Sequence, residues 1–399
     1  MRLPSLKYLH MFRPRLIPNI SDTYLNTPEA VIISGMRGTG KTSLLNHLYG
    51  RLNKRNKILI DLENPLNRKY FEEDNYEIIK TSFELLGIDF SQKPYIFLDE
   101  IQFVKNLPSI ARYFIEQYEV KFCLTSSARF SLRNILSESL PEKNHVIELY
   151  PLSFREFLRF KDISTKIPEK SCDLTPDLFD TLSHLYDEYI RFGGFPGVVL
   201  KTSARAKKKA LEEIFSSFFH LEISQLGDFR RNKEIRDLML LLMKRAGSQL
   251  DFQKTSRELK ISRPSLYEYV SFLERTYFIR AIRPLSRNRN SEIRKAPKVF
   301  ICDTGLACHL AQQNMENLFE NSIFQNLRSK GRLNYYKRKI GAEIDFILNG
   351  KTGYRVKHNP LKGDTQKLEE MAVGLKLEEF KTISRSHIHS ENIMYGFML

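Results

Sequence analysis

The feature that most constrains the fold of this chain is a glycine-rich octapeptide that joins an apolar run to an amphipathic stretch. The run before it, residues 30–34, is short, apolar and β-branched, as a buried parallel strand is, and residues 43–52 predict a helix. A strand that passes through glycines into a helix indicates an α/β arrangement. The eight residues are Gly35, Met36, Arg37, Gly38, Thr39, Gly40, Lys41 and Thr42.

The octapeptide matches the pattern GxxxxGK[ST], which is suited to binding phosphate groups. Its glycines let successive backbone N–H groups point inward at the phosphates, and the helix that follows adds the positive end of its dipole. We expect Lys41 to reach the β and γ oxygens as a catalytic residue and the Thr42 hydroxyl to bind Mg²⁺. Ser43, the next residue, completes the predicted nucleotide-binding set.

Two adjacent carboxylates supply the partner motif. An apolar run over residues 95–98 ends in Asp99 and Glu100, and ligands of an open parallel sheet bind at the carboxyl ends of its strands. Asp99 is then the carboxylate on the magnesium side, and Glu100 is the candidate base that polarises the attacking water. Ser126 follows another apolar run, residues 120–125, and its hydroxyl is expected near the γ-phosphate. The sequence therefore predicts hydrolysis of a bound triphosphate.

The pattern of predicted strands and helices divides the chain into four regions. Strands and helices alternate through residues 1–150, which specifies a three-layer α/β sandwich with a mostly parallel sheet. Residues 151–245 have a helical pattern, residues 246–310 contain a helix–turn–helix pattern, and residues 311–399 form a second α/β unit. The glycine-rich turn at 193–197 is a candidate hinge in the helical part.

Positive charge concentrates in one quarter of the chain. The formal net charge is +16, and residues 201–300 hold 23 Lys and Arg against 11 Asp and Glu. Such a density attracts polyanions through release of their counterions. Within this quarter, residues 251–283 resemble a winged helix-turn-helix, which makes DNA a predicted partner. The candidate nucleic-acid contacts are Arg263, Ser265, Arg287 and Arg289.

Six motifs, in order, resemble those of a family of prokaryotic AAA+ ATPases. They are GMRGTGKT (35–42), LDEIQ (98–102), LTSS (124–127), YPLSFREF (150–157), GGFP (193–196) and KVFICDTGLA (298–307). The resemblance, which covers about residues 28–360, implies ATP as the nucleotide. It also implies the fold class: an α/β P-loop NTPase sandwich of AAA+ type, then a helical and winged helix-turn-helix region, then a PD-(D/E)xK nuclease-like α/β domain.

The sequence departs from this family in one stretch near the ATPase site. Relatives usually carry Gly-Arg near its end, whereas Glu142 and Lys143 stand here. If that arginine serves the active site of the relatives, a lysine is a poorer bidentate partner for phosphate. The remaining candidates for an arginine that stabilises the developing charge, in cis or from a neighbouring subunit, are Arg129, Arg133 and Arg155.

The nuclease-like resemblance rests on Glu320, Asp345 and Lys357. Active members of that superfamily place an acid before E-x-K on the next strand, because carboxylates hold a metal and the lysine steadies the attacked phosphate. Here Arg355 stands at the acidic position and would repel a divalent ion. We therefore expect a non-cleaving domain, although Glu343, on the same strand face as Asp345, could serve as a second ligand.

Composition excludes several other classes of protein. Four dispersed cysteines without a CxxC pair argue against a disulfide framework or a thiolate zinc site. The longest purely apolar run is far shorter than the roughly twenty residues of a membrane span, and the N-terminus lacks a secretion signal, so the cytoplasm is expected. Two alternatives to a DNA-acting ATPase stay open: a nucleotide-gated DNA-binding regulator with slow turnover, and an ATPase that acts on a protein partner. A homo-oligomer is also possible for this class of ATPase.

Overall fold

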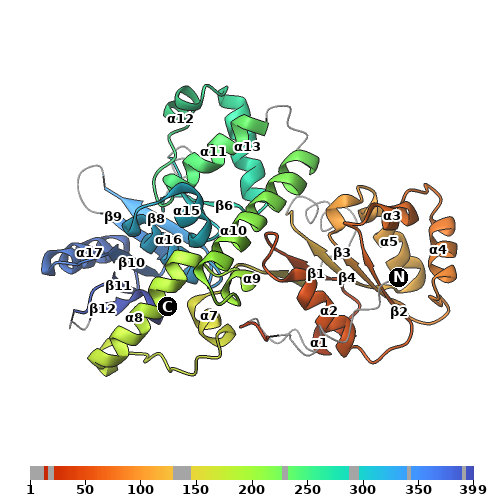
Figure 1. Ribbon diagram of the computed structural model, residues 1–399, viewed down its shortest axis with the longest axis horizontal. Coiled ribbons are helices and arrows are strands. Elements are labelled where there is room, and N and C mark those ends of the chain that lie inside the picture. Colours follow the sequence, from red (N-terminus) through yellow and green to blue (C-terminus); the bar gives the residue numbers. More distant parts are fainter. Residues whose placement is uncertain are drawn as a thin grey trace. The chain divides into compact units, whose positions relative to one another are not determined.

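The computed structural model describes residues 13–16, 22–128, 145–226, 232–286, 296–338, 343–388 and 392–399 (Figure 1). The chain divides between Tyr150 and Pro151 into two compact units. The N-terminal unit consists of residues 1–150 together with the short segment Arg275–Tyr277, and the C-terminal unit consists of the remainder.

The N-terminal unit is built on a five-stranded parallel sheet with strand order β2-β3-β4-β1-β5. β1, which leads into the glycine-rich loop, therefore lies between β4 and β5. The strands are β1 (Val31–Ser34), β2 (Lys57–Asp61), β3 (Tyr95–Asp99), β4 (Lys121–Ser126) and β5 (His145–Glu148). The α-helices are α1 (Asp22–Asn26), α2 (Lys41–Arg51), α3 (Pro65–Arg68), α4 (Tyr76–Leu85) and α5 (Leu107–Tyr118).

Helices cover both faces of this sheet, because the central strands are apolar on both sides (Figure 1). Ile32 of β1 packs in one core cluster with residues of α4 and α5. Its neighbours Val31 and Ile33 pack in another with residues of α1 and α2. Alternate residues of a strand point to opposite faces, so the two clusters form the two interfaces of a three-layer sandwich. This confirms the predicted α/β architecture with a parallel sheet.

The C-terminal unit begins with helices whose starts are marked in the sequence. Ser153 and Glu156 form a reciprocal capping box at the start of α7, and Thr175 caps α8, which has Pro176 in its first turn. The helices of this region are α7 (Phe154–Phe160), α8 (Pro176–Phe192), α9 (Pro196–Val199), α10 (Ala204–Phe218), the π-helix η6 (Phe219–Leu226), α11 (Asn232–Lys244), α12 (Phe252–Leu259) and α13 (Arg263–Arg275).

Two sheets follow the helices. β6 (Ile279–Ile282) and β7 (Lys298–Ile301) form an antiparallel pair, after which come α15 (Thr304–Ala311) and α16 (Met315–Leu327). The second sheet is mixed, with strand order β12-β11-β10-β9-β8. Its elements are β8 (Leu333–Lys337), β9 (Glu343–Leu348), β10 (Thr352–Lys357), α17 (Lys362–Leu375), β11 (Glu379–Ser384) and β12 (Ile393–Tyr395).

The turn at 193–197 packs closely against the start of α15. The backbone N–H of Gly194 donates to Asp303 Oδ2 at 2.7 Å, and a β-carbon on Gly193 would overlap the Asp303 carboxylate. The two glycines therefore permit a close approach between α8 and the start of α15. The glycines thus serve tight packing inside one unit, and a hinge at this turn stays a prediction.

Candidate functional site

The loop between β1 and α2 has the shape that its glycines predict. Gly38 and Gly40 adopt φ angles of 85° and 98°, which L-residues with a side chain rarely adopt. Gly35 has φ 155°, and a β-carbon there would overlap the carbonyl oxygen of Leu149. The loop is closed by Thr39, whose backbone N–H and hydroxyl donate to the carbonyl oxygen of Met36 at 3.3 and 2.8 Å. The sequence thus folds locally into a backbone cradle of anion-binding type.

Lys41 is the first residue of α2 and is 3% exposed. Its ammonium lies 3.3 Å from Glu100 Oε1, so the lysine of the loop and the second acid of the β3 motif are brought together. It also lies 3.5 Å from the carbonyl oxygen of Met36. The sequence predicted both residues for one site but did not predict their ion pair.

Thr42 and Asp99, the residues predicted on the magnesium side, are also in contact. Thr42 donates its hydroxyl proton to Asp99 Oδ2 at 2.7 Å, across from the loop to the end of β3. Burial raises the pKa of Asp99 to about 6, and the neighbouring charge of Glu100 adds to this shift. Magnesium prefers oxygen ligands, and a hydroxyl beside a carboxylate at the mouth of a phosphate cradle fits that ion. Thr42 and Asp99 are the residues that would hold it.

Glu100 lies in an environment that keeps it ionised. It is 5% exposed and has a left-handed backbone with φ 56°, which turns its side chain away from the strand direction. Burial alone would raise the pKa of Glu100, but Lys41 and a hydrogen bond from Gln102 lower it below the ordinary value. A carboxylate held in its basic form at neutral pH is what a general base needs.

Gln102 and Thr125 belong to the site although the sequence analysis did not assign them a role. Gln102 Nε2 donates to Glu100 Oε2 and to Ser127 Oγ, both at 2.6 Å. Thr125 donates its hydroxyl proton to Asp99 and accepts the backbone N–H of Glu100 at 2.8 Å. The only signal in the sequence was their position, two residues after an acid and at the end of an apolar run.

Ser126, the predicted contact for the γ-phosphate, lies at the end of β4 as expected. Its hydroxyl donates to Gln102 Oε1 at 3.2 Å and to the carbonyl oxygen of Ala128 at 3.0 Å. Thr125, not Ser126, contacts the acids of β3 directly. Ser126 is linked to Glu100 through Gln102, and its contact with the γ-phosphate stays a prediction.

Two arginines brace the loop. Arg37, predicted to contact nucleotide, forms a bidentate pair with Glu63 at 2.9 and 2.8 Å. Arg15 donates to the carbonyl oxygens of Thr39 at 3.0 Å and of Tyr150 at 2.7 Å. Ser43 lies in the first turn of α2 and is exposed. In this structure the side chain of Arg37 thus holds the loop to the segment after β2.

The candidate charge-stabilising residues are mostly outside the described residues, which is so for Arg129, Arg133 and Lys143. Arg155 is described, and it donates to the carbonyl oxygens of Met398 at 3.1 Å and Leu399 at 3.3 Å. Its guanidinium thus has a structural contact inside the C-terminal unit.

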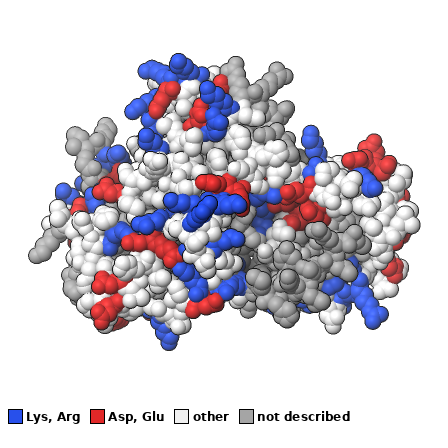
Figure 2. All heavy atoms as spheres, viewed as in Figure 1, with Lys and Arg blue, Asp and Glu red and all other residues white. Residues whose placement is uncertain are grey.

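The predicted nucleic-acid contacts are partly described. Arg263 begins α13 and is exposed, while Ser265 is tied to Ser262, whose hydroxyl oxygen accepts the Ser265 N–H at 3.2 Å. Arg287 and Arg289 lie outside the described residues. Figure 2 shows basic and acidic side chains intermixed over α12, at the top of the view. Part of that basic charge is neutralised, because Arg245 pairs with both oxygens of Glu258 at 2.8 Å.

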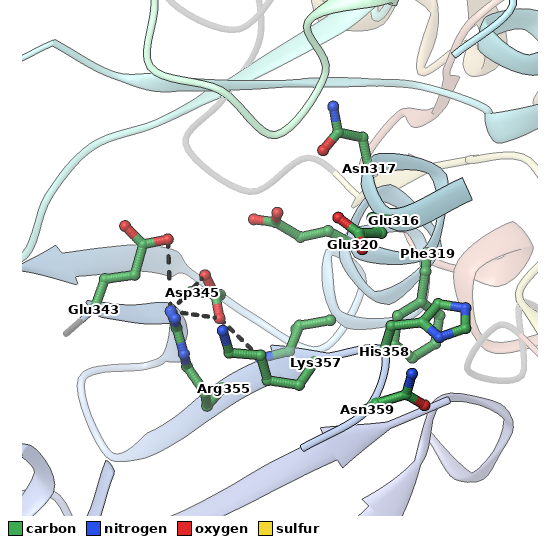
Figure 3. A pocket seen from close by; sticks show the side chains of 11 residues that line it. Glu316, Asn317, Phe319, Glu320, Glu343, Asp345, Arg355, Lys357, His358 and Asn359 are labelled. Atoms are coloured by element: carbon green, nitrogen blue, oxygen red, sulfur yellow. Dashed lines mark hydrogen bonds and ion pairs between the residues drawn. The ribbon is translucent and has the colours of Figure 1, made fainter. Parts of the chain in front are cut away.

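The residues of the predicted nuclease-like site do come together. Glu320, Asp345 and Lys357 line one cavity of about 390 Å³, and Arg355 also lines it (Figure 3). Arg355 Nη1 lies 3.2 Å from both oxygens of Asp345. The arginine therefore pairs with the carboxylate that would otherwise bind a metal. Lys298, which the sequence analysis did not connect with this site, pairs with Glu320 and Asp345 at 3.0 and 3.3 Å.

Comparison with protein families finds matches to two parts of the chain. Residues 27–158 match a family described as AAA domain, and residues 183–317 match a domain of unknown function (DUF8612). An uncharacterized protein of Methanocaldococcus jannaschii is 26% identical over 347 residues, which are 84% of this chain and 74% of that protein. An uncharacterized protein of Haemophilus influenzae is 27% identical over 338 residues, 81% of this chain and 80% of that protein.

Solved structures that resemble part of the chain were also found. A structure of AMPPCP-bound DnaA from Aquifex aeolicus has a TM-score of 0.24 and 16% identity, covering 63% of this chain and 83% of that one. A structure of C. elegans PCH-2 has a TM-score of 0.26 and 17% identity; the alignment covers 48% of this chain and 56%, or little more than half, of that one. No described helix is long and apolar enough to cross a membrane. The chain therefore carries an AAA domain of P-loop type, followed by a region that resembles a domain of unknown function.

Proposed function

We propose that the protein binds ATP with Mg²⁺ at the loop of the N-terminal unit and hydrolyses it. The observation that supports this most is the convergence of Lys41, Thr42, Asp99 and Glu100, which join in two pairs at 3.3 and 2.7 Å. The match of residues 27–158 to the AAA domain points to the same chemistry. AAA domains bind nucleotides, and the acid pair is the part that hydrolysis requires.

Each group at the site has a separate role in the proposed reaction. The backbone N–H groups of the glycine loop and the start of α2 bind the phosphates, and Lys41 exchanges its ion pair with Glu100 for a contact with phosphate oxygens. Mg²⁺ bound by Thr42 and Asp99 would neutralise charge on the phosphates. Glu100, released by the lysine and held by Gln102, orients water and accepts its proton.

The test compares Glu100→Gln with Lys41→Ala in the full chain. Glu100→Gln is expected to bind MgATP with wild-type affinity while its turnover falls at least about a hundredfold, because it removes only the base. Lys41→Ala is expected to lose affinity and turnover. Lys80, which is half-buried, and the exposed Glu84 form a pair at 3.4 Å on α4 outside the site, so Lys80→Ala and Glu84→Gln are matched controls. Wild-type turnover by Glu100→Gln would refute the assignment.

A second candidate function is nucleotide-gated binding to DNA, with the helical pair α12 and α13 as the contact. It is favoured by the excess of 23 basic over 11 acidic residues in 201–300 and by the exposed Arg263 at the start of α13. We expect salt-dependent duplex binding that Arg263→Gln weakens and that Lys209→Gln, at an exposed position of α10, leaves unchanged. Absence of binding at low salt would leave a protein partner as the target of the ATPase.

A further inference from the structure

Three carboxylates of the C-terminal unit converge on a single ammonium group. Lys298 Nζ lies 3.0 Å from Glu320 on α16, and 3.2 and 3.3 Å from Glu343 and Asp345 on β9. The lysine is 4% exposed and opens β7, a strand of the other, two-stranded sheet. We call these three acids the carboxylate cluster. Lys298 therefore reaches its centre from a different sheet than the one that carries two of its acids.

Two further cations contact the cluster from other directions. Arg355 on β10 lies 3.2 Å from both oxygens of Asp345 and 3.5 Å from Glu343, as Figure 3 shows. Lys337 lies 3.7 Å from Glu343. Only Lys298 contacts all three acids in the described part of the chain. Three contacting cations balance three carboxylates, so little negative field is left to attract a free cation.

The spacing of the cluster fits an ammonium and not a metal. Nitrogen–oxygen distances of 3.0 to 3.3 Å are those of ion pairs with long hydrogen bonds, whereas oxygen ligands lie about 2.0–2.6 Å from Mg²⁺ or Ca²⁺. In the described residues, no group of three or more His, Cys, Asp or Glu is arranged to hold a metal ion. Without Lys298, the acids would have to move inward by roughly 1 Å to bind one.

We propose that the carboxylate cluster is a cation site whose resident cation is the ammonium of Lys298, and that a divalent metal enters only when this side chain is removed. All three acids also line the cavity of about 390 Å³, together with Lys357, His358 and Asn359. Burying three carboxylates without a central cation would be costly, so the cluster either keeps its lysine or acquires a substitute.

The experiment measures Mn²⁺ binding by the full chain, using the paramagnetic signal of the free ion. Lys298→Met is compared with Arg355→Gln, a matched control because each removes one positive charge from the same acids but only Lys298 occupies their centre. Every protein, including the reference, carries Asp99→Asn so that an ion at the ATPase loop is not counted. Lys298→Met with added Asp345→Asn locates any ion that is gained.

Lys298→Met is expected to bind one Mn²⁺ at least about tenfold more tightly than the reference or Arg355→Gln, and Mn²⁺ should raise its unfolding temperature by several degrees. Asp345→Asn should abolish that gain. If Arg355→Gln bound Mn²⁺ as tightly as Lys298→Met, the proposal would be overturned, because the loss of one positive charge at either position would then be enough for metal binding. Two other results would also overturn the proposal. One is Mn²⁺ binding by the reference protein that is lost when Glu320→Gln is added, and the other is a folded Lys298→Met that binds no Mn²⁺.

If Lys298→Met folds only with metal, its Mn²⁺-dependent refolding supports the proposal. Should it fail to fold in both conditions, Lys298→Ala with Glu320→Gln replaces it, because this pair removes one charge of each sign. Lack of Mn²⁺ binding by that folded double variant counts against a cation site at the cluster.

Discussion

Gln102 uses every polar atom of its amide inside the candidate ATPase site. Its nitrogen donates to Glu100 and Ser127 at 2.6 Å, and its oxygen accepts from the Ser126 hydroxyl at 3.2 Å and the Ser127 N–H at 3.3 Å. The amide thus ties the base at the end of β3 to the end of β4. Given the proposed function, Gln102 is a positioning residue that acts through Glu100.

Gln102→Met keeps the length of the side chain but removes these hydrogen bonds. We expect kcat to fall on the order of tenfold with KM nearly unchanged, because Glu100 loses its orientation while the phosphate-binding loop is intact. Steady-state ATPase kinetics measure this, and Gln92→Met, at an exposed glutamine of the same unit, is the control. A variant that raises KM and leaves kcat unchanged would assign Gln102 to binding instead.

At the scale of single residues, the sequence predicted the contacts between residues that belong to recognised motifs. The neighbours Lys41 and Thr42 and the neighbours Asp99 and Glu100 were assigned to one site because both motifs lie at strand ends, and they do meet. The pairing of Lys298 with Asp345 was not predictable in this way. Their sequence separation is large, and nothing local indicates that β7 and β9 bring them together.

Asp303 shows how one side chain joins two elements. It caps α15 by accepting the N–H of Gly305 at 2.9 Å, and it accepts the N–H of Gly194 at 2.7 Å from the turn after α8. The carboxyl is fully buried, and this burial raises its pKa to about 6. The folded state therefore binds a proton at Asp303 more tightly than the unfolded chain does.

The stability of the C-terminal unit should reflect this proton. The folded pKa of Asp303 is about 6 against 3.8 for the ordinary carboxyl, so its contribution to the free energy of unfolding falls as pH rises through that window. Asp303→Asn cannot ionise and should remove that fall, which corresponds to at most about 3 kcal/mol. Urea unfolding of both proteins between about pH 4 and pH 7 tests this. A constant difference between them would contradict it.

Elements were more predictable than contacts, because their signals are local. The sequence predicted strands at 95–98 and 120–125, and they are found at Tyr95–Asp99 and Lys121–Ser126. It could not predict that β1 lies between β4 and β5, since strand order depends on how helices pack. The packing of Gly193 against Asp303 was not predictable either, because a glycine that permits close packing and one that permits motion have the same sequence signal.

The whole molecule consists of two compact units, and the candidate ATPase residues all lie in the N-terminal one. The boundary between Tyr150 and Pro151 falls where the pattern of the sequence changes from alternating strands and helices to helices. The finer division of the C-terminal unit into helical, winged-helix and nuclease-like parts stays a prediction.

A ligand of one unit should stabilise that unit selectively. With a non-hydrolysable ATP analogue and Mg²⁺ at about a hundred times Kd, we expect the unfolding free energy of the N-terminal unit to rise by about 2.7 kcal/mol. Calorimetry should then show one transition moving to higher temperature and the other staying. Lys41→Ala should abolish the shift. If both transitions move to higher temperature together, the two units unfold cooperatively, and nucleotide binding to the N-terminal unit also stabilises the C-terminal one.

The placement of the cysteines offers a way to follow this effect of nucleotide binding. Cys123 and Cys302 are buried, Cys308 is half-buried and Cys172, in the C-terminal unit, is exposed. Burial raises the pKa of the Cys123 thiol to about 12, which suppresses its reactivity. After Cys308→Ala, a maleimide dye should attach at Cys172 alone. Energy transfer from that dye to a fluorescent nucleotide would report, in real time, the distance between the two units during turnover.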